Sequence, residues 1–160
     1  PLRGGERLII KIAGNSKTNE GLDFSVTPDQ YFYVASVTNV LLNEGTESFT
    51  LNLVSREAIT NETTRVGKKF PTSQKISGSL EDILKNYLID DKIGDIEETK
   101  NTYGFIGNMR KPFTVLTMLA SKSVPGNVSG KDATAGYFFF ETSKPSSIKI
   151  LMICLSFLRS

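Results

Sequence analysis

The sequence predicts an α+β fold, with an antiparallel, barrel-like β half followed by a small helix-strand-helix-strand α/β unit. Before residue 54, apolar residues recur with a period of two, which is typical of strands with one buried face. From residue 79 onward the spacing changes to the three-and-four pattern of amphipathic helices. We therefore expect a β domain at residues 1–75 that is incomplete at its N-terminus, a small α/β domain at residues 76–145, and an atypical tail at residues 146–160.

Four alternating segments make up the β half. Their apolar faces are Leu8, Ile10 and Ile12; Leu22, Phe24 and Val26; Tyr31, Tyr33, Ala35 and Val37; and Phe49, Leu51 and Leu53. Gly14-Asn15 is a turn sequence between the first two segments, and Asn43-Glu44-Gly45 predicts the turn of an antiparallel pair formed by the last two. Because four short strands do not leave an apolar face in water, we expect them to close into a barrel or to pack on another sheet.

Residues 55–75 interrupt this alternation, and we interpret them as an extended polar connection. They carry a basic cluster that faces an acidic partner or DNA in one interpretation and only solvent in the other, which is the commoner case. The cluster consists of Arg65, Lys68 and Lys69.

Helical spacing begins at Ser79, which we expect to be the N-cap of the first helix. Its apolar stripe is Leu80, Ile83, Leu84, Tyr87 and Leu88. A short strand is expected within residues 95–99. Pro112 is suited to the first position of a second helix, which Val124-Pro125-Gly126 should end. A loop over residues 126–135 and a buried strand over residues 136–141 follow.

The apolar stretch at residues 148–158 spans about 16 Å as a helix, roughly half of a bilayer core, so we do not expect it to cross a membrane. Two explanations fit its abrupt change of composition after Pro145: a truncated or frame-shifted end, or a strand that needs an absent partner. The chain begins at Pro1 without a methionine, and we interpret it as an internal piece of a longer protein.

Composition excludes several kinds of chemistry. The chain has no histidine and a single cysteine, Cys154, so histidine-based nucleophile arrangements, an internal disulfide and a cysteine cage for metal are excluded. The net charge is +2 and is spread evenly, unlike the concentrated charge of a nucleic-acid binder. We predict no catalytic residue, cofactor or metal ligand.

Three weak patterns do not change this prediction. Residues 126–131 have one residue too few between their glycines for a phosphate-binding loop and lack the following Ser or Thr. An acidic cluster at residues 90–98 does not have the spacing of a calcium loop. Its carboxylates lie in polar sequence, which does not favour the raised pKa that a glycosidase acid requires.

Several ordered blocks resemble the baseplate hub subunit of T-even-type contractile-tailed phages, particularly marine relatives. The resemblance covers roughly residues 4–142, and its blocks are residues 53–62, 65–70, 76–86, 103–113 and 119–123. It implies a trimeric ring in the virion, assembled in the host cytoplasm, that joins the tail tube to the central spike with its lysozyme. The family has no catalytic residues to carry over, and nucleic acid would only pass through the tube lumen. Residues 144–160 depart from the expected continuation.

The leading hypothesis is therefore a structural virion protein that associates with itself and with tail tube and spike proteins. In such a ring the strand over residues 47–54 is expected to pair with a neighbouring copy. Interface candidates are Phe49, Leu51, Leu53, Arg65, Lys68 and Lys69. The alternative is a cell-wall or carbohydrate-binding module of a phage tail, which would require an exposed aromatic platform. A hydrolase is the third hypothesis.

Overall fold

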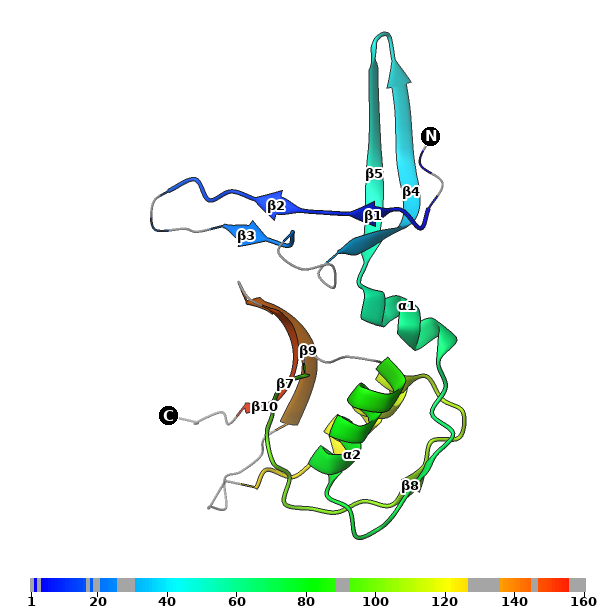
Figure 1. The fold of residues 1–160 in the computed structure, drawn as a ribbon, viewed down its shortest axis with the longest axis vertical. Helices are drawn as coiled ribbons and strands as arrows, with labels where there is room; N and C mark the ends of the chain where they lie inside the picture. The colour runs from blue at the N-terminus through cyan, green and yellow to red at the C-terminus, as the bar shows by residue number, and fades with distance from the viewer. Residues whose placement is uncertain are drawn as a thin grey trace. The chain divides into compact units, whose positions relative to one another are not determined.

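The computed structural model describes most of the chain as strands and helices in two compact units (Figure 1). The described residues are 2, 4–16, 18, 21–25, 31–88, 93–126, 136–144 and 147–155. The first unit is Pro1–Ile59 and the second is Thr60–Ser160. Antiparallel strand pairs combined with α-helices confirm the α+β class. The boundary between the units precedes residue 75, because β6 (Lys69–Phe70) pairs with β8 (Phe105–Ile106) inside the second unit.

Antiparallel strands make up the first unit. Their bounds are β1 Arg7–Leu8, β2 Lys11–Ile12, β3 Leu22–Asp23, β4 Phe32–Asn43 and β5 Thr46–Val54. They form one sheet in the order β1-β4-β5 and a two-stranded sheet β2-β3, and no pairing between described residues closes either sheet into a barrel. The predicted turn is confirmed: Asn43 pairs with Thr46 across Glu44-Gly45, and Gly45 has a φ of 81°, which glycine adopts without strain.

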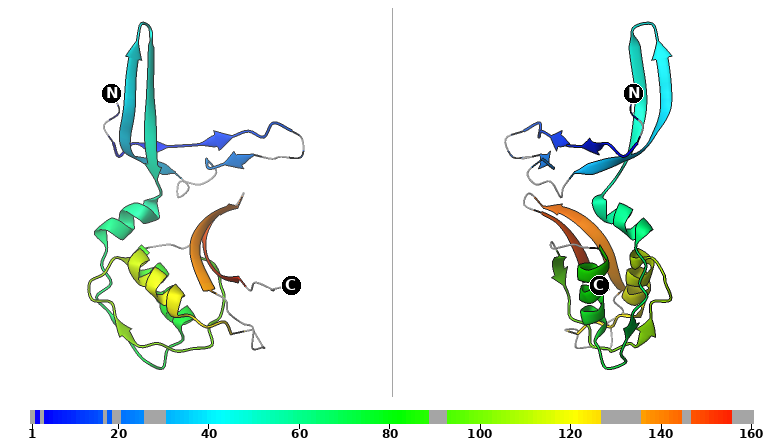
Figure 2. Two further views of the ribbon diagram at one scale, coloured as in Figure 1. Left: turned by 180° about the vertical axis from the view of Figure 1, so that it is seen from behind. Right: turned by 45° about the vertical axis from the view of Figure 1, so that its right-hand side comes forward.

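The long β4–β5 hairpin runs well past the short strand β1, as the views in Figure 2 also show. Two β-bulges lie in β4, one at Ala35 and one at Asn39 and Val40, where β4 has an extra residue relative to β5. Asn39 has a φ of 52°, a left-handed conformation that asparagine tolerates better than most residues. Each bulge reverses the face on which the following residues of β4 lie.

The bulges correct one predicted face. Tyr33 and Val37 were expected to share a face, but Tyr33 lies opposite Val54 whereas Val37 lies opposite Leu51. Residues 54 and 51 of the regular strand β5 point to opposite sides of the sheet. Val37 therefore shares its face with Val34, the partner of Leu53.

The second unit combines helices with two further sheets. Its elements are α1 Arg56–Thr63 (which begins in the first unit), β6, α2 Ile76–Ile83, the π-helix η2 Leu84–Leu88, β7 Ile93–Ile96, β8, α3 Pro112–Lys122, β9 Gly136–Lys144 and β10 Ser147–Leu155. The second predicted helix corresponds to α3 and was predicted correctly, with Pro112 at its first position. The strand from residue 136 is confirmed as β9. The short strand expected at residues 95–99 is instead β7, which ends at Ile96.

Two expectations about helices were wrong. Residues 55–75 are not wholly extended, because Ser55 accepts a hydrogen bond from the backbone N–H of Ala58 (3.3 Å) and so caps α1. Ser79 is not an N-cap either. It lies inside α2, fully buried, because that helix begins at Ile76, where distant residues supply acceptors for its first N–H groups.

The core of the described chain lies in the second unit. Its buried apolar residues are Val66, Phe70, Ile76, Leu80, Ile83, Leu84, Leu88, Val115, Leu116, Leu119, Ala120 and Tyr137. This set contains the apolar stripe of the first predicted helix, which the structure forms as α2 and η2. The exception is Tyr87, which is partly buried against the core. Helices α2 and α3 pack together, and the sheet of β9 and β10 lies against this helical layer (Figure 1).

The C-terminal stretch forms the strand β10, which lies between two partners of the same chain. It pairs antiparallel with β9 and parallel with β7, in the sheet order β7-β10-β9. Of the two explanations for this stretch, a strand that needs an absent partner is therefore wrong, because β10 has two partners in the described chain. Of the loop predicted over residues 126–135, residues 127–135 lie outside the described part of the chain.

Candidate functional site

One face of the β4–β5 hairpin is mostly apolar, with Glu47 as a charged residue near the turn. The register places Val34, Val37 and Leu42 of β4 on the same face as Phe49, Leu51 and Leu53 of β5. Val40 lies in the bulge directly before Leu41 of the opposite face, and alternation assigns it to the apolar face. Val34 is only 2% exposed, whereas Val40 is 50% exposed and Leu42 is 75% exposed. The apolar face thus becomes more exposed from the base of the hairpin toward its turn.

The opposite face of the hairpin is mostly polar and has its own hydrogen bonds. The side-chain amide of Asn52 donates to Ser36 Oγ at 2.9 Å and to Thr38 Oγ1 at 3.4 Å. The amide of Asn39 donates to Thr50 Oγ1 at 3.4 Å. This face is solvated and locally satisfied, which leaves the apolar face as the one that gains from a partner.

The structure brings the three predicted residues of β5 together on that apolar face. Phe49 is 43% exposed, and Leu51 and Leu53 are half-buried. β5 is also an edge strand of its sheet, so one row of its backbone groups has no strand partner among the described residues. Sequence reasoning missed Val40 and Leu42, although an apolar run directly before a turn was visible in the sequence.

The three predicted basic residues lie exposed in the second unit, with different contacts. Lys68 forms an ion pair with Asp82 at 2.9 Å. The guanidinium of Arg65 donates to the backbone oxygens of Glu62 (2.9 Å) and Thr64 (2.7 Å), which holds its charge in place. Lys69 lies in β6 opposite Ile106. Within the described part of the chain, neither Arg65 nor Lys69 forms an ion pair, although the charge of Arg65 helps to lower the pKa of the Glu62 carboxyl group.

A strained turn presents apolar side chains beside these charges. Asn108 and Met109 have φ values of 50° and 55°, and the N–H of Arg110 donates to Gly107 O at 3.0 Å. These are the φ signs of a type I′ turn, whose second central position favours glycine. Met109 is nevertheless there and is 65% exposed, and Ile106 is 56% exposed.

We call Arg65, Lys69, Ile106 and Met109 the basic knuckle. Arg65, Gly67 and Lys69 are exposed, whereas Val66 and Phe70 are buried. The Met109 sulfur would lie only 3.1 Å from a Cβ at Gly67, which places it between positions 65 and 69. Lys69 is the cross-strand partner of Ile106, so these two side chains lie side by side on one face of the strand pair.

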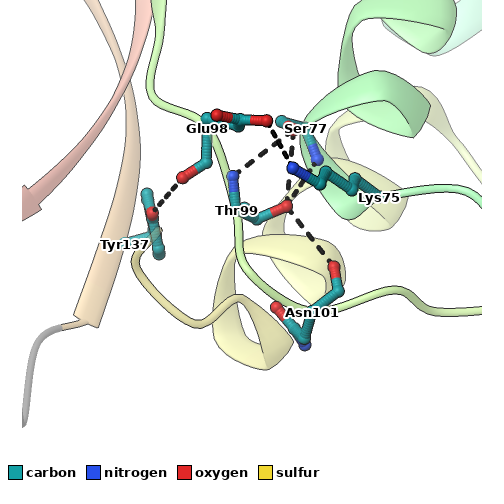
Figure 3. Close-up of polar contacts among 6 residues, drawn as sticks. All are labelled: Lys75, Ser77, Glu98, Thr99, Asn101 and Tyr137. Carbon is teal, nitrogen blue, oxygen red and sulfur yellow. Dashed lines mark hydrogen bonds and ion pairs between the residues drawn. The ribbon is translucent and has the colours of Figure 1, made fainter. Parts of the chain in front are cut away.

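A polar network fixes the start of α2 (Figure 3). Thr99 is fully buried, and its Oγ1 accepts the N–H of Ser77 at 3.0 Å. The backbone oxygen of Asn101 accepts the N–H of Ile76 at 3.4 Å. Tyr137 Oη donates to Glu98 O at 3.3 Å, which connects this segment to β9. Every polar contact in this network is internal, and we assign it to the fold.

The remaining features of the described residues are modest. A shallow open depression of about 480 Å³ lies on α3 and is lined by Phe113, Thr114, Thr117, Met118 and Ser121. In the part of the chain that the structure describes, no group of three or more histidine, cysteine, aspartate or glutamate side chains is placed to hold a metal. None of the helices there has both the length and the apolar character that a membrane span requires.

Comparison with known proteins adds no relative. No protein-family model, curated protein or solved structure matches the chain.

Proposed function

We propose that the protein is a structural virion subunit, a baseplate hub subunit that works by self-association and not by catalysis. The apolar surface of the first unit is the observation that supports this role most directly. Val34 is the only fully buried hydrophobic residue among the described residues of Pro1–Ile59, and the other buried hydrophobic residues lie in the second unit. Most of the large exposed hydrophobic residues, by contrast, belong to the first unit.

A unit of this size is only marginally stable without a core of its own. Its apolar surface is therefore best explained as one that a partner covers on assembly. The edge strand β5 and the apolar face of the hairpin supply the two kinds of contact that strand-to-strand association uses, which are backbone hydrogen bonds and side-chain burial. The sequence resemblance to hub subunits favours further copies of the chain as the partner, with tail tube and spike proteins as neighbours.

The test is the oligomeric state of the chain and of two matched variants. Sedimentation at tens of micromolar should show self-association, with three-membered rings in electron micrographs. Leu42→Asn, on the apolar face, should weaken association at least about tenfold, because a leucine side chain buried in an interface contributes roughly 1.5–3 kcal/mol. Leu41→Asn is the control, since Leu41 is the neighbouring exposed leucine and lies on the polar face opposite Ser48.

A wild-type chain that remains monomeric at these concentrations contradicts the proposal. Peptidoglycan pull-down and zymography on the same preparation test the carbohydrate-binding and hydrolase alternatives. A monomer that is retained by the glycan would favour the carbohydrate-binding module instead.

A further inference from the structure

The exposed end of the β4–β5 hairpin is acidic as well as apolar. Residues 32–54 contain two glutamates and no lysine or arginine. Glu47 lies opposite Leu42 on the apolar face, and Glu44 lies in the turn. Both are exposed. We call Val40, Leu42, Glu44, Glu47 and Phe49 the hairpin tip, a surface of three apolar side chains with a charge of −2.

The basic knuckle of the second unit has the complementary composition. It consists of the apolar side chains of Ile106 and Met109, with Arg65 and Lys69 beside them. Two acidic side chains near these residues have lysine partners: Asp82 pairs with Lys68, and Glu62, whose carboxylate also interacts with the charge of Arg65, pairs with Lys111. The side chains of the knuckle itself carry a charge of +2 around an apolar centre.

We propose that the hairpin tip of one copy binds the basic knuckle of a second copy. This inference rests on the proposed function and specifies which surfaces meet. Leu42, Val40 and Phe49 would cover Ile106 and Met109, while Glu44 and Glu47 face Arg65 and Lys69. Apolar burial in the centre with charges at the rim is the usual arrangement of a specific interface.

Such a contact is head-to-tail, because the two surfaces belong to different units of the chain. Each copy offers one tip and one knuckle, so every added copy leaves one of each for the next. Contacts of this heterologous kind close into rings when the rotation between copies allows it. An isologous contact, in which two hairpins meet each other, would use neither the knuckle nor its charges.

Charge reversal distinguishes the two arrangements. The tip variant carries Glu44→Lys and Glu47→Lys, and the knuckle variant carries Arg65→Glu and Lys69→Glu. In each variant alone, tip and knuckle have the same sign of charge, and we expect the dissociation constant to rise roughly 10- to 100-fold because like charges then face each other. Lys85→Glu with Lys100→Glu is the matched control, an equal charge change in the second unit outside the knuckle, and it should associate like the wild type.

Mixing the two variants is the decisive measurement. The lysine tip of one then meets the glutamate knuckle of the other, and the native pair meets at the second contact. We expect complexes with equal numbers of the two variants, which also demonstrates that both are folded. Because each variant binds only the other variant, the two must alternate around a ring. A closed ring then contains an even number of copies, so these mixed complexes cannot close as three-membered rings.

Two results would overturn the proposal while leaving self-association intact as a function. The first is a knuckle variant that associates as strongly as the wild type. The second is a mixture of the two variants that shows no recovery. A wild-type chain that never associates would instead remove the proposed function, and this inference with it.

Discussion

The side-chain oxygen of Asn61 accepts a hydrogen bond from the backbone N–H of Phe113 at 2.8 Å. Asn61 lies in α1 and is only 7% exposed, whereas Phe113 lies in the first turn of α3. The residue before that helix, Lys111, makes no side-chain capping bond. Asn61 therefore acts as an N-cap for a helix that lies far from it in the sequence, and it connects α1 to the core of the second unit.

Asn61→Ala should lower the free energy of unfolding of the second unit by about 1–2 kcal/mol, since it removes a cap and leaves a partly buried N–H without an acceptor. Urea unfolding followed by helical circular dichroism measures this loss. Thr114→Ala is the control on the exposed side of α3 and should change stability by less than about 0.5 kcal/mol. Equal effects of the two variants would show that the Asn61 cap contributes nothing.

Thr99→Val tests the second distant cap. The substitution keeps the size of the side chain but removes the hydroxyl that accepts the N–H of Ser77. We expect a loss of about 1–3 kcal/mol, because the N–H is left unpaired in a buried site. Thr102→Val makes the same chemical change at an exposed position and should be nearly neutral. A neutral Thr99→Val would mean that water replaces the hydroxyl.

The Thr99 cap explains why α2 was predicted as a helix while its beginning was misplaced. The apolar stripe from Leu80 to Leu88 is a local pattern, and the structure buries it as expected. The start of α2 depends instead on Thr99 and Asn101, which meet it only after the chain has folded back. A local capping rule therefore selected Ser79, the wrong residue.

Asn39 should be replaceable by glycine but not by a β-branched residue. Its φ of 52° costs valine about 1–2 kcal/mol, whereas glycine adopts it freely. Hydrogen exchange of the amides in β4 and β5 should become faster in Asn39→Val. In Asn39→Gly it should stay unchanged or become slower. Thr46→Val, at an exposed position of the same hairpin without positive φ, should not accelerate exchange.

The same bulge limited what the sequence revealed about the apolar face. Phe49, Leu51 and Leu53 alternate strictly, and the regular strand β5 keeps them on one face as predicted. Val34, Val37 and Val40 are spaced by three, so a strict period of two would place neighbouring members of this set on opposite faces of the sheet. The extra residue at each bulge of β4 brings them to the same face. The knuckle was missed in part for a similar reason, since Met109 joins Arg65 and Lys69 through pairing between distant segments.

Met109→Gly should change stability and association in opposite directions. Relief of the left-handed φ should stabilise the second unit by about 1 kcal/mol, while loss of the exposed side chain should weaken self-association severalfold. Thermal unfolding and sedimentation of one preparation measure both. Asn108→Gly, in the same turn, should give a smaller gain in stability and unchanged association. Met109→Gly that associates like the wild type would exclude Met109 from the interface.

Asp23 should titrate well below an ordinary aspartate. Hydrogen bonds from Lys11 and Ser25 lower its pKa from 3.8 to about 2. A depressed folded-state pKa favours folding above pH 3.8, and this contribution is lost as the pH falls toward 2. NMR titration of the carboxyl group checks the value, and Lys11→Met should move the pKa back up. An unchanged pKa in that variant would attribute the shift to Ser25 alone.

The place of β10 in its sheet has a consequence for synthesis of the protein. In the sheet, β10 lies between β7 and β9, which both leave the ribosome before it and pair with it, not with each other. This sheet therefore cannot assemble strand by strand as the chain emerges. Until β10 is released, the edges of two nascent strands stay exposed, and chaperones that shield such edges would be most needed in that interval.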